Sequence, residues 1–170
     1  MRRDRRALED LSHCLWEERQ VVTHLLFKLT VTRLLLAADE RRFVAQALAE
    51  VETAVDALRQ DEYRRDEALR VLAGLWGTDP LLLTLAELAR LAPPPFDHTF
   101  ADHAGAFRAL AAEIDHVARE NRVLAQGDLQ MVADQLDHLT GPQLPVASTY
   151  DASGQLDATT GVGRRLREVF

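Results

Sequence analysis

A stretch of seventy residues without glycine or proline, from Asp4 to Ala73, constrains this chain more than any other feature of its sequence. As one α-helix the stretch would be about 105 Å long, since each residue adds about 1.5 Å, so the chain must fold back on itself. Such a stretch also carries a heptad pattern, which predicts amphipathic helices packed side by side. Leucine and valine recur at steps of seven in two registers: Leu8, Leu15, Val22, Leu29 and Leu36, then Val44, Val51, Leu58 and, after a gap, Leu72.

The two heptad registers are out of phase, and the slip falls between Ala37 and Arg42. A turn at this point would let the second helix run back along the first, and we predict that Asp39 caps the second helix. The alternative is one continuous helix with a skip in its heptads. Glu62 and Arg65 interrupt the second apolar stripe, and we interpret them as a splayed or solvated part of the bundle.

Glycine and proline return after Ala73 and divide the remaining sequence. Turn-forming residues in the segment 74–80 end the second helix. A short helix is predicted over Leu81–Leu91, where Thr84 and Glu87 fit a capping box. Three consecutive prolines, 93–95, must end it because proline cannot continue a helix.

A third long amphipathic segment runs from Phe100 to Leu139, and we expect its helix to start at Asp97 or Thr99. About forty residues at about 1.5 Å each span roughly 60 Å, which exceeds the width of a small domain. Part of its apolar stripe must therefore find a partner elsewhere. The stripe follows the helical period, mostly in steps of three or four, through Phe100, Phe107, Leu110, Ile114, Val117, Leu124, Met131, Val132, Leu136 and Leu139.

Together these segments predict an all-α fold, an antiparallel bundle or coiled coil of three long helices plus one short helix, formed by residues 1–140. Residues 141–170 combine turn-forming residues with little periodic apolar content, and we predict a flexible C-terminal tail with a local turn at Asp151–Gly154. The heptads serve equally for folding back and for pairing between chains, so a monomer and a homodimer both remain open.

The net charge of −7 argues against nucleic-acid binding, because phosphate contacts need a concentrated basic face. Cys14 is the one cysteine, so no internal disulfide can form, and a reducing cytoplasm is the simplest setting.

Acidic residues Glu9 and Asp10 stand where a signal peptide would have its apolar core. Uninterrupted apolar runs such as Leu34–Ala38 are far shorter than the about 20 residues that cross a bilayer, so we expect no stable membrane insertion.

Side chains that could carry catalysis or hold a metal are sparse. Glu113 and His116 have the Glu-x-x-His spacing of di-iron bundles, but such a site needs two of these pairs, and the sequence has one. His13 and Cys14 point about 100° apart on a helix, so they do not form a base and nucleophile pair. The sequence also lacks a Gly-rich phosphate loop. We therefore expect no cofactor, no metal and no enzymatic activity.

Several short motifs follow one another along nearly the whole chain. They are Leu15-Trp16-Glu17-Glu18, Leu25-Leu26-Phe27-Lys28-Leu29, Leu34-Leu35-Leu36-Ala37-Ala38, Glu50-Val51-Glu52, Thr84-Leu85-Ala86-Glu87-Leu88-Ala89, Asn121-Arg122 and Thr149-Tyr150-Asp151-Ala152-Ser153-Gly154. In this order they resemble the FlgN family of flagellar export chaperones, in its actinobacterial-like form. The resemblance implies binding of the hook-filament junction proteins FlgK and FlgL in the cytoplasm and their delivery to the flagellar type III export gate, whose FlhA component is the receptor.

The client of such a chaperone exposes the apolar stripe of a terminal helix, which would aggregate unless a complementary groove shielded it. We place this groove on the distal third helix. The alternative for each of its residues is packing against the first two helices. The predicted client-binding residues are Leu124, Met131, Val132, Leu136 and Leu139.

Tyr150 is the predicted anchor for the export gate, because a tyrosine in a polar tail has little core to join and few rotors to freeze on binding. Asp151 and Gly154 would shape the turn that presents it. An alternative function is a structural coiled-coil scaffold or adaptor protein that self-associates, although a scaffold has no need of this tail motif. A metal-dependent bundle enzyme is a third class, which metal analysis of the purified protein would test.

Overall fold

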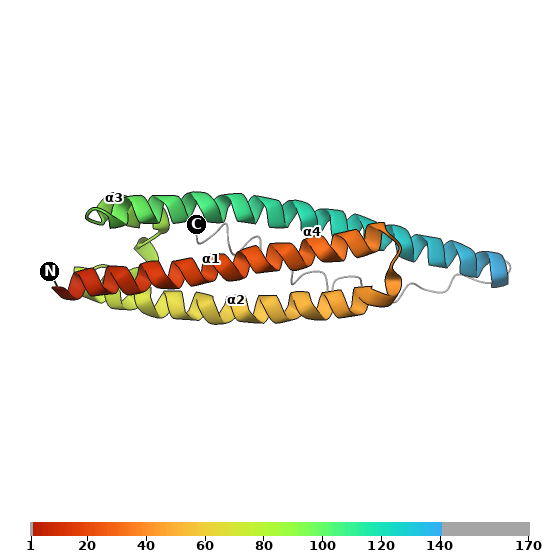
Figure 1. Ribbon diagram of the computed structural model, residues 1–170, viewed down its shortest axis with the longest axis horizontal. Coiled ribbons are helices and arrows are strands. Elements are labelled where there is room, and N and C mark those ends of the chain that lie inside the picture. The colour runs from red at the N-terminus through yellow and green to blue at the C-terminus, as the bar shows by residue number, and fades with distance from the viewer. Residues whose placement is uncertain (1, 141–170) are drawn as a thin grey trace.

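The computed structural model describes residues 2–140, without the side chains of Val132 and residues 136–140. Within this range the chain forms helices α1 (Arg2–Ala37), α2 (Arg41–Trp76), α3 (Leu85–Leu91) and α4 (Phe96–Thr140), with a short 3-10 helix η1 (Pro80–Leu82) between α2 and α3. The predicted all-α class, with three long helices and a short one, is confirmed. The three long helices alternate in direction along the chain, and the central α1 packs against α2 on one side and α4 on the other (Figure 1).

The turn between α1 and α2 lies where the heptad registers slip, so the chain forms two helices and not one continuous helix. Asp39 has a left-handed backbone with φ of 55°. Its N–H donates to the Leu36 carbonyl (3.2 Å), and that of Glu40 donates to the Leu35 carbonyl (2.9 Å), which is the Schellman pattern of a helix C-terminus. The prediction that Asp39 caps α2 is wrong. Glu40 holds the N-cap position, because aspartate tolerates left-handed backbone and here ends α1.

The predicted short helix is split into two pieces. Asp79 caps η1, and α3 begins only at Leu85, four residues later than expected. Thr84 caps α3 as predicted, since its Oγ1 accepts from the Glu87 N–H at 3.2 Å. The Glu87 carboxylate pairs with Arg90. Leucines of this segment cover one end of the bundle, and α4 then starts at Phe96, directly after the prolines.

Most of the predicted heptad residues form the core, whereas Leu36 and Val44, next to the α1–α2 turn, are only partly buried. The largest members on α4, Phe100 and Phe107, are fully buried, and α4 contacts both α1 and α3. Full burial of each such side chain contributes about 1.5–3 kcal/mol, so this seam holds the three long helices together. The buried heptad residues are Leu8, Leu15, Val22 and Leu29 of α1, Val51, Leu58 and Leu72 of α2, and Phe100, Phe107 and Ile114 of α4.

A buried ion pair joins α1 to α2. Arg65 and Glu18 are both buried, with 2.7 Å between Nη1 and Oε1. The expectation that Glu62 and Arg65 mark a splayed or solvated part of the bundle is therefore wrong for Arg65. Antiparallel packing brings Glu18 opposite Arg65, and a buried charge is tolerable only when it is paired. Burial raises the pKa of Glu18 to about 7, and the charge of Arg65 opposes this rise.

Helix α1 is long and apolar enough, by length and composition alone, to cross a membrane. The test allows charged residues within its window, whereas the uninterrupted apolar runs of α1 are short, so the absence of stable membrane insertion stays a prediction. The core helix of a bundle passes the same test, and α1 contacts both other long helices. Part of its surface stays uncovered, since Phe27 and Leu34 are exposed.

Candidate protein-docking site

The distal part of α4 extends beyond the turn that joins α1 and α2 (Figure 1). Arg41, the first residue of α2, marks the level of that turn, because its Nη2 lies 3.5 Å from Asp128 Oδ1 and 4.0 Å from Met131 Sδ. From Met131 to Thr140 the helix continues for about 14 Å more. Near the level of the turn, Leu129 is 70% exposed and Met131 is 48% exposed. Apolar side chains of α4 therefore remain accessible there.

A change in one heptad register of α4 explains why the bundle opens toward this end. Phe100, Phe107 and Ile114 stand at steps of seven and are fully buried. The next two positions in the same register are Asn121 and Asp128, both polar. Because apolar burial is what draws helices together, the attraction of α4 to the α1–α2 hairpin weakens beyond Ile114. In the neighbouring register the four positions before Val132 are all alanines: Ala104, Ala111, Ala118 and Ala125.

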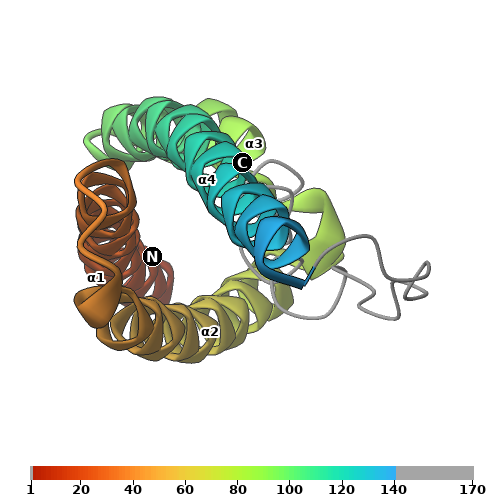
Figure 2. The ribbon, with the colours of Figure 1, turned by 90° about the vertical axis from the view of Figure 1, so that its right-hand side faces the viewer.

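An apolar groove of about 490 Å³ lies between α2 and α4, with α1 as its floor, and we call it the α2–α4 groove. Viewed from the end, the three long helices form an arc with α1 in the middle (Figure 2). Since α4 presents alanines here, Leu48 on the α2 wall stays 48% exposed. The lining residues are Leu29, Thr32 and Leu36 of α1, Val44, Leu48, Val51, Glu52, Val55, Asp56 and Arg59 of α2, and Ala118, Asn121 and Ala125 of α4.

Asn121 is a buried polar side chain in the wall of this groove. Its Nδ2 donates to the Leu29 carbonyl at 3.0 Å. Its Oδ1 has no hydrogen-bond donor among the residues that the structure describes. A buried acceptor without a donor costs about 1–3 kcal/mol. Sequence reasoning did not assign Asn121 to a site, although its place in the Phe100 and Phe107 register was a readable signal.

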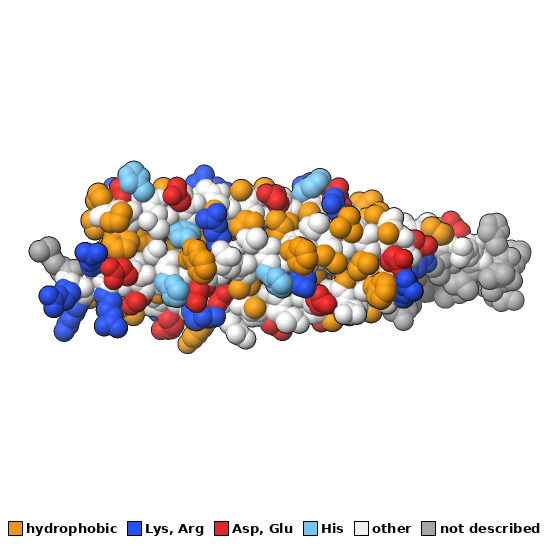
Figure 3. Space-filling model, in the orientation of Figure 1, with side chains coloured by type: hydrophobic (Ala, Val, Ile, Leu, Met, Phe, Trp, Pro, Cys, Tyr) orange, Lys and Arg blue, Asp and Glu red, His pale blue; other side chains and the backbone are white. Residues whose placement is uncertain are grey.

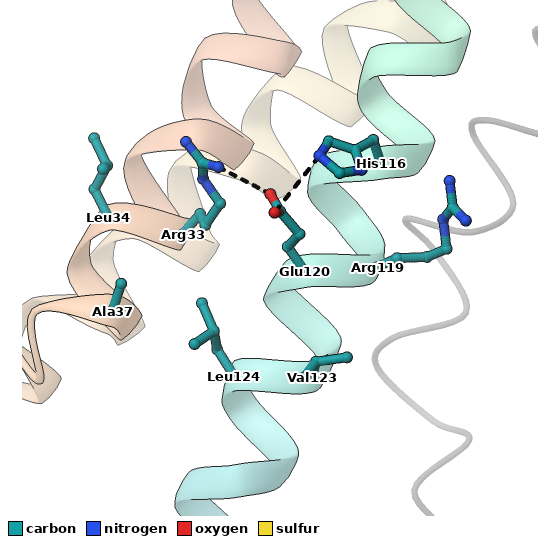
Figure 4. A pocket seen from close by; sticks show the side chains of 8 residues that line it. All are labelled: Arg33, Leu34, Ala37, His116, Arg119, Glu120, Val123 and Leu124. Carbon is teal, nitrogen blue, oxygen red and sulfur yellow. Dashed lines mark hydrogen bonds and ion pairs between the residues drawn. The ribbon is translucent and has the colours of Figure 1, made fainter.

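A second, shallower depression of about 620 Å³ lies on the outer side of the α1–α4 contact, and we call it the outer pocket (Figure 4). Arg33 Nη1 lies 2.9 Å from Glu120 Oε2, and His116 Nε2 lies 3.5 Å from Glu120 Oε1. Exposed Leu34 and Val123 flank this charged group. On the face that carries this pocket, hydrophobic side chains gather toward the end where α1 turns into α2 (Figure 3).

The structure places two of the five predicted client-binding side chains. Leu124 is half-buried and lines the outer pocket, and Met131 is exposed beside Arg41. The side chains of Val132, Leu136 and Leu139 lie outside the described residues, as do the predicted gate-docking residues Tyr150, Asp151 and Gly154. The described part of the stripe is therefore accessible at Met131 and only partly so at Leu124.

The groups considered for metal binding or catalysis make ordinary contacts. His116 pairs with Glu120, one turn further along α4, and both it and Glu113 are exposed. Within residues 2–140, no group of three or more potential metal ligands comes together. Burial raises the pKa of the Cys14 thiol, which keeps it protonated and a poor nucleophile. From their spacing of four residues, His13 with Glu17 and His98 with Asp102 are predicted surface pairs. His13 does lie 3.5 Å from Glu17, whereas His98 lies 3.9 Å from Asp97.

A helical bundle with an open groove and a projecting amphipathic helix has the architecture of a protein that binds other helices. The family model described as FlgN protein matches residues 1–158. The chain therefore belongs to the FlgN family, a family of flagellar export chaperones and not of enzymes. Comparison with curated proteins and with solved structures finds no match.

Proposed function

We propose that this protein is a cytoplasmic chaperone that binds the terminal amphipathic helices of FlgK and FlgL, prevents their premature association and delivers them to the export gate. Membership of the family supports the chaperone class. The observation that carries the choice of binding surface is the accessible apolar side chains of α4, Leu129 and Met131, at the point where α4 leaves the α1–α2 hairpin.

The proposed client helix lies along distal α4 and buries its own apolar stripe there. Burial of apolar surface drives such contacts, and a helix laid against a helix matches 3.6-residue stripes on both partners. Met131 is flexible and polarisable, which suits a surface that must accept two different clients. In this proposal Leu124, Val132, Leu136 and Leu139 complete the stripe with Met131.

Calorimetric titration with peptides covering the terminal helices of FlgK and FlgL from the same organism tests this function. We expect saturable one-to-one binding with a negative heat-capacity change, which is the mark of apolar burial. A scrambled peptide of the same composition is the control. A folded protein that binds neither peptide would contradict the proposal. Concentration-dependent self-association in light scattering, without peptide binding, would instead favour the scaffold or adaptor function.

Delivery to the gate is assigned to Tyr150, with Asp151 and Gly154 shaping the turn that presents it. We expect Tyr150→Ala to weaken binding to FlhA and to reduce motility while leaving the affinity for client peptides unchanged, because the client surface lies on α4. Tyr150→Phe is the matched control, since it keeps the aromatic ring. Equal loss of both binding activities in Tyr150→Ala would remove the proposed division between client surface and tail.

A further inference from the structure

The α2–α4 groove has chemical features that define what would fill it. Its walls are largely apolar, with Leu48 exposed, and the Oδ1 of Asn121 is buried without a donor in the described part of the chain. Its α2 wall also carries Glu52 and Asp56. Asp56 pairs with Arg59 at 2.8 Å, whereas Glu52 has no ion pair with a described residue. The matching occupant is a short apolar segment that brings positive charge and N–H donors.

We propose that the C-terminal segment of this same chain, residues 164–170, occupies the α2–α4 groove. Its sequence is Arg-Arg-Leu-Arg-Glu-Val-Phe, with three arginines against one glutamate, in a chain whose net charge is −7. At helical spacing Leu166, Val169 and Phe170 share one face. The arginines supply the donors and the charge that Asn121 and Glu52 lack. The family match ends at residue 158, before this segment begins.

The geometry of the chain favours an intramolecular contact. Asn121 lies nineteen residues before the end of α4 at Thr140, which is about 28 Å along the helix. The connecting residues 141–163 form a 23-residue linker rich in Gly, Ser and Thr, for which the average end-to-end distance is about 26 Å. A tether whose average length matches the span gives an effective concentration in the millimolar range. The segment therefore occupies the groove even with contacts too weak for a free peptide.

An occupied groove has consequences that do not depend on cargo. The segment covers Leu48 and the other apolar side chains of the α2 wall, and this apolar surface is then unavailable to a second copy or to an unrelated protein. The contact does not require FlgK or FlgL, because only residues of this chain form it.

Nuclear magnetic resonance of the full-length chain with a paramagnetic spin label tests the proposal. The label is attached at Glu168→Cys, which lies off the apolar face, in a chain that also carries Cys14→Ser. We expect the backbone amide signals of the groove-wall residues within 44–56 to lose most of their intensity. A millimolar effective concentration keeps about half the segments bound by a millimolar contact, and the fast exchange of so weak a contact averages strong paramagnetic relaxation onto these amides. The signals of α3 should stay unchanged.

Two further variants examine the contact from each side. Ala125→Trp fills the groove and should restore the lost signals, while the matched Val123→Trp, on the outer pocket of the same helix, should not. The double variant Leu166→Ser and Phe170→Ser removes apolar side chains from the segment itself and should also restore the groove-wall signals. Full intensity in the original labelled chain, or loss that persists in both restoring variants, would overturn the proposal. Loss seen only between labelled and unlabelled molecules in a mixture would overturn it in favour of a second copy.

Discussion

Replacing Arg65 with methionine is expected to lower the free energy of unfolding by about 3–5 kcal/mol at pH 8, because Glu18 is then left buried without its partner. The loss should be smaller at pH 5. Burial raises the pKa of Glu18 in the folded state to about 7, against 4.5 as its ordinary value. The stability tied to this carboxyl is therefore fully present below pH 4.5 and is lost as the pH rises through 7. Without Arg65 the pKa of Glu18 rises further. The variant is therefore less stable than the wild type mainly at high pH.

Urea denaturation of the wild type and the Arg65→Met variant at the two pH values measures this difference. Arg70→Met is the matched control, because Arg70 lies on the same helix and its ion pair with Glu67 is exposed, so its loss should cost less than about 1 kcal/mol. Combining Arg65→Met with Glu18→Leu should recover most of the stability, since both charges are then gone. If Arg65→Met is as mild as Arg70→Met at pH 8, the pair is not buried as described.

The chaperone variant that combines Val132→Asp with Leu136→Asp is expected to lose at least about 100-fold in affinity for the client peptides. Each aspartate would have to leave water against the apolar stripe of the client, and a total cost of about 3 kcal/mol corresponds to about that factor. The calorimetric titration described above measures the loss. Val132 and Leu136 belong to the apolar stripe of α4.

The thermal midpoint decides between a binding role and a core role for Val132 and Leu136. We expect it to stay within a few degrees of the wild type, because the helix there runs past the end of the α1–α2 hairpin. Val71→Asp, an exposed position on α2 far from this end, is the control for a surface charge change. A collapse of the thermal midpoint in the Val132→Asp and Leu136→Asp variant alone would assign these residues to the core.

Much of the fold could be predicted because helices depend on interactions close in sequence. The heptads placed Leu15, Val22 and Leu58 in the core, and the proline run limited α3. The turn at the register slip was also predictable, because two helices out of phase cannot share one straight seam. Its details were not. Aspartate can end a helix with a left-handed backbone or begin a helix as its N-cap. The sequence does not show which of the two conformations Asp39 adopts, and in the structure its backbone is left-handed.

The candidate site was only partly predictable, because part of it is formed by residues from three different helices. The α4 stripe was visible in the sequence, and its described member Met131 is accessible. The α2–α4 groove was not predicted, because a groove is a property of two walls and a floor. Alanines such as Ala118 and Ala125 predict helix equally well whether they face solvent, a core or an open groove. Only the packing of α4 against α1 leaves Leu48 of α2 uncovered.

Periodicity, capping residues and prolines act within a few turns of the chain, and they are enough to predict three long amphipathic helices and a short one. The positions of the buried charges and of the cavities depend on contacts between distant segments. Glu18 and Arg65 are 47 residues apart and meet only because α2 returns along α1. The groove likewise exists because α4 follows α1 and leaves α2 partly open. Such contacts depend on which faces of distant helices meet, and local sequence does not encode that choice residue by residue.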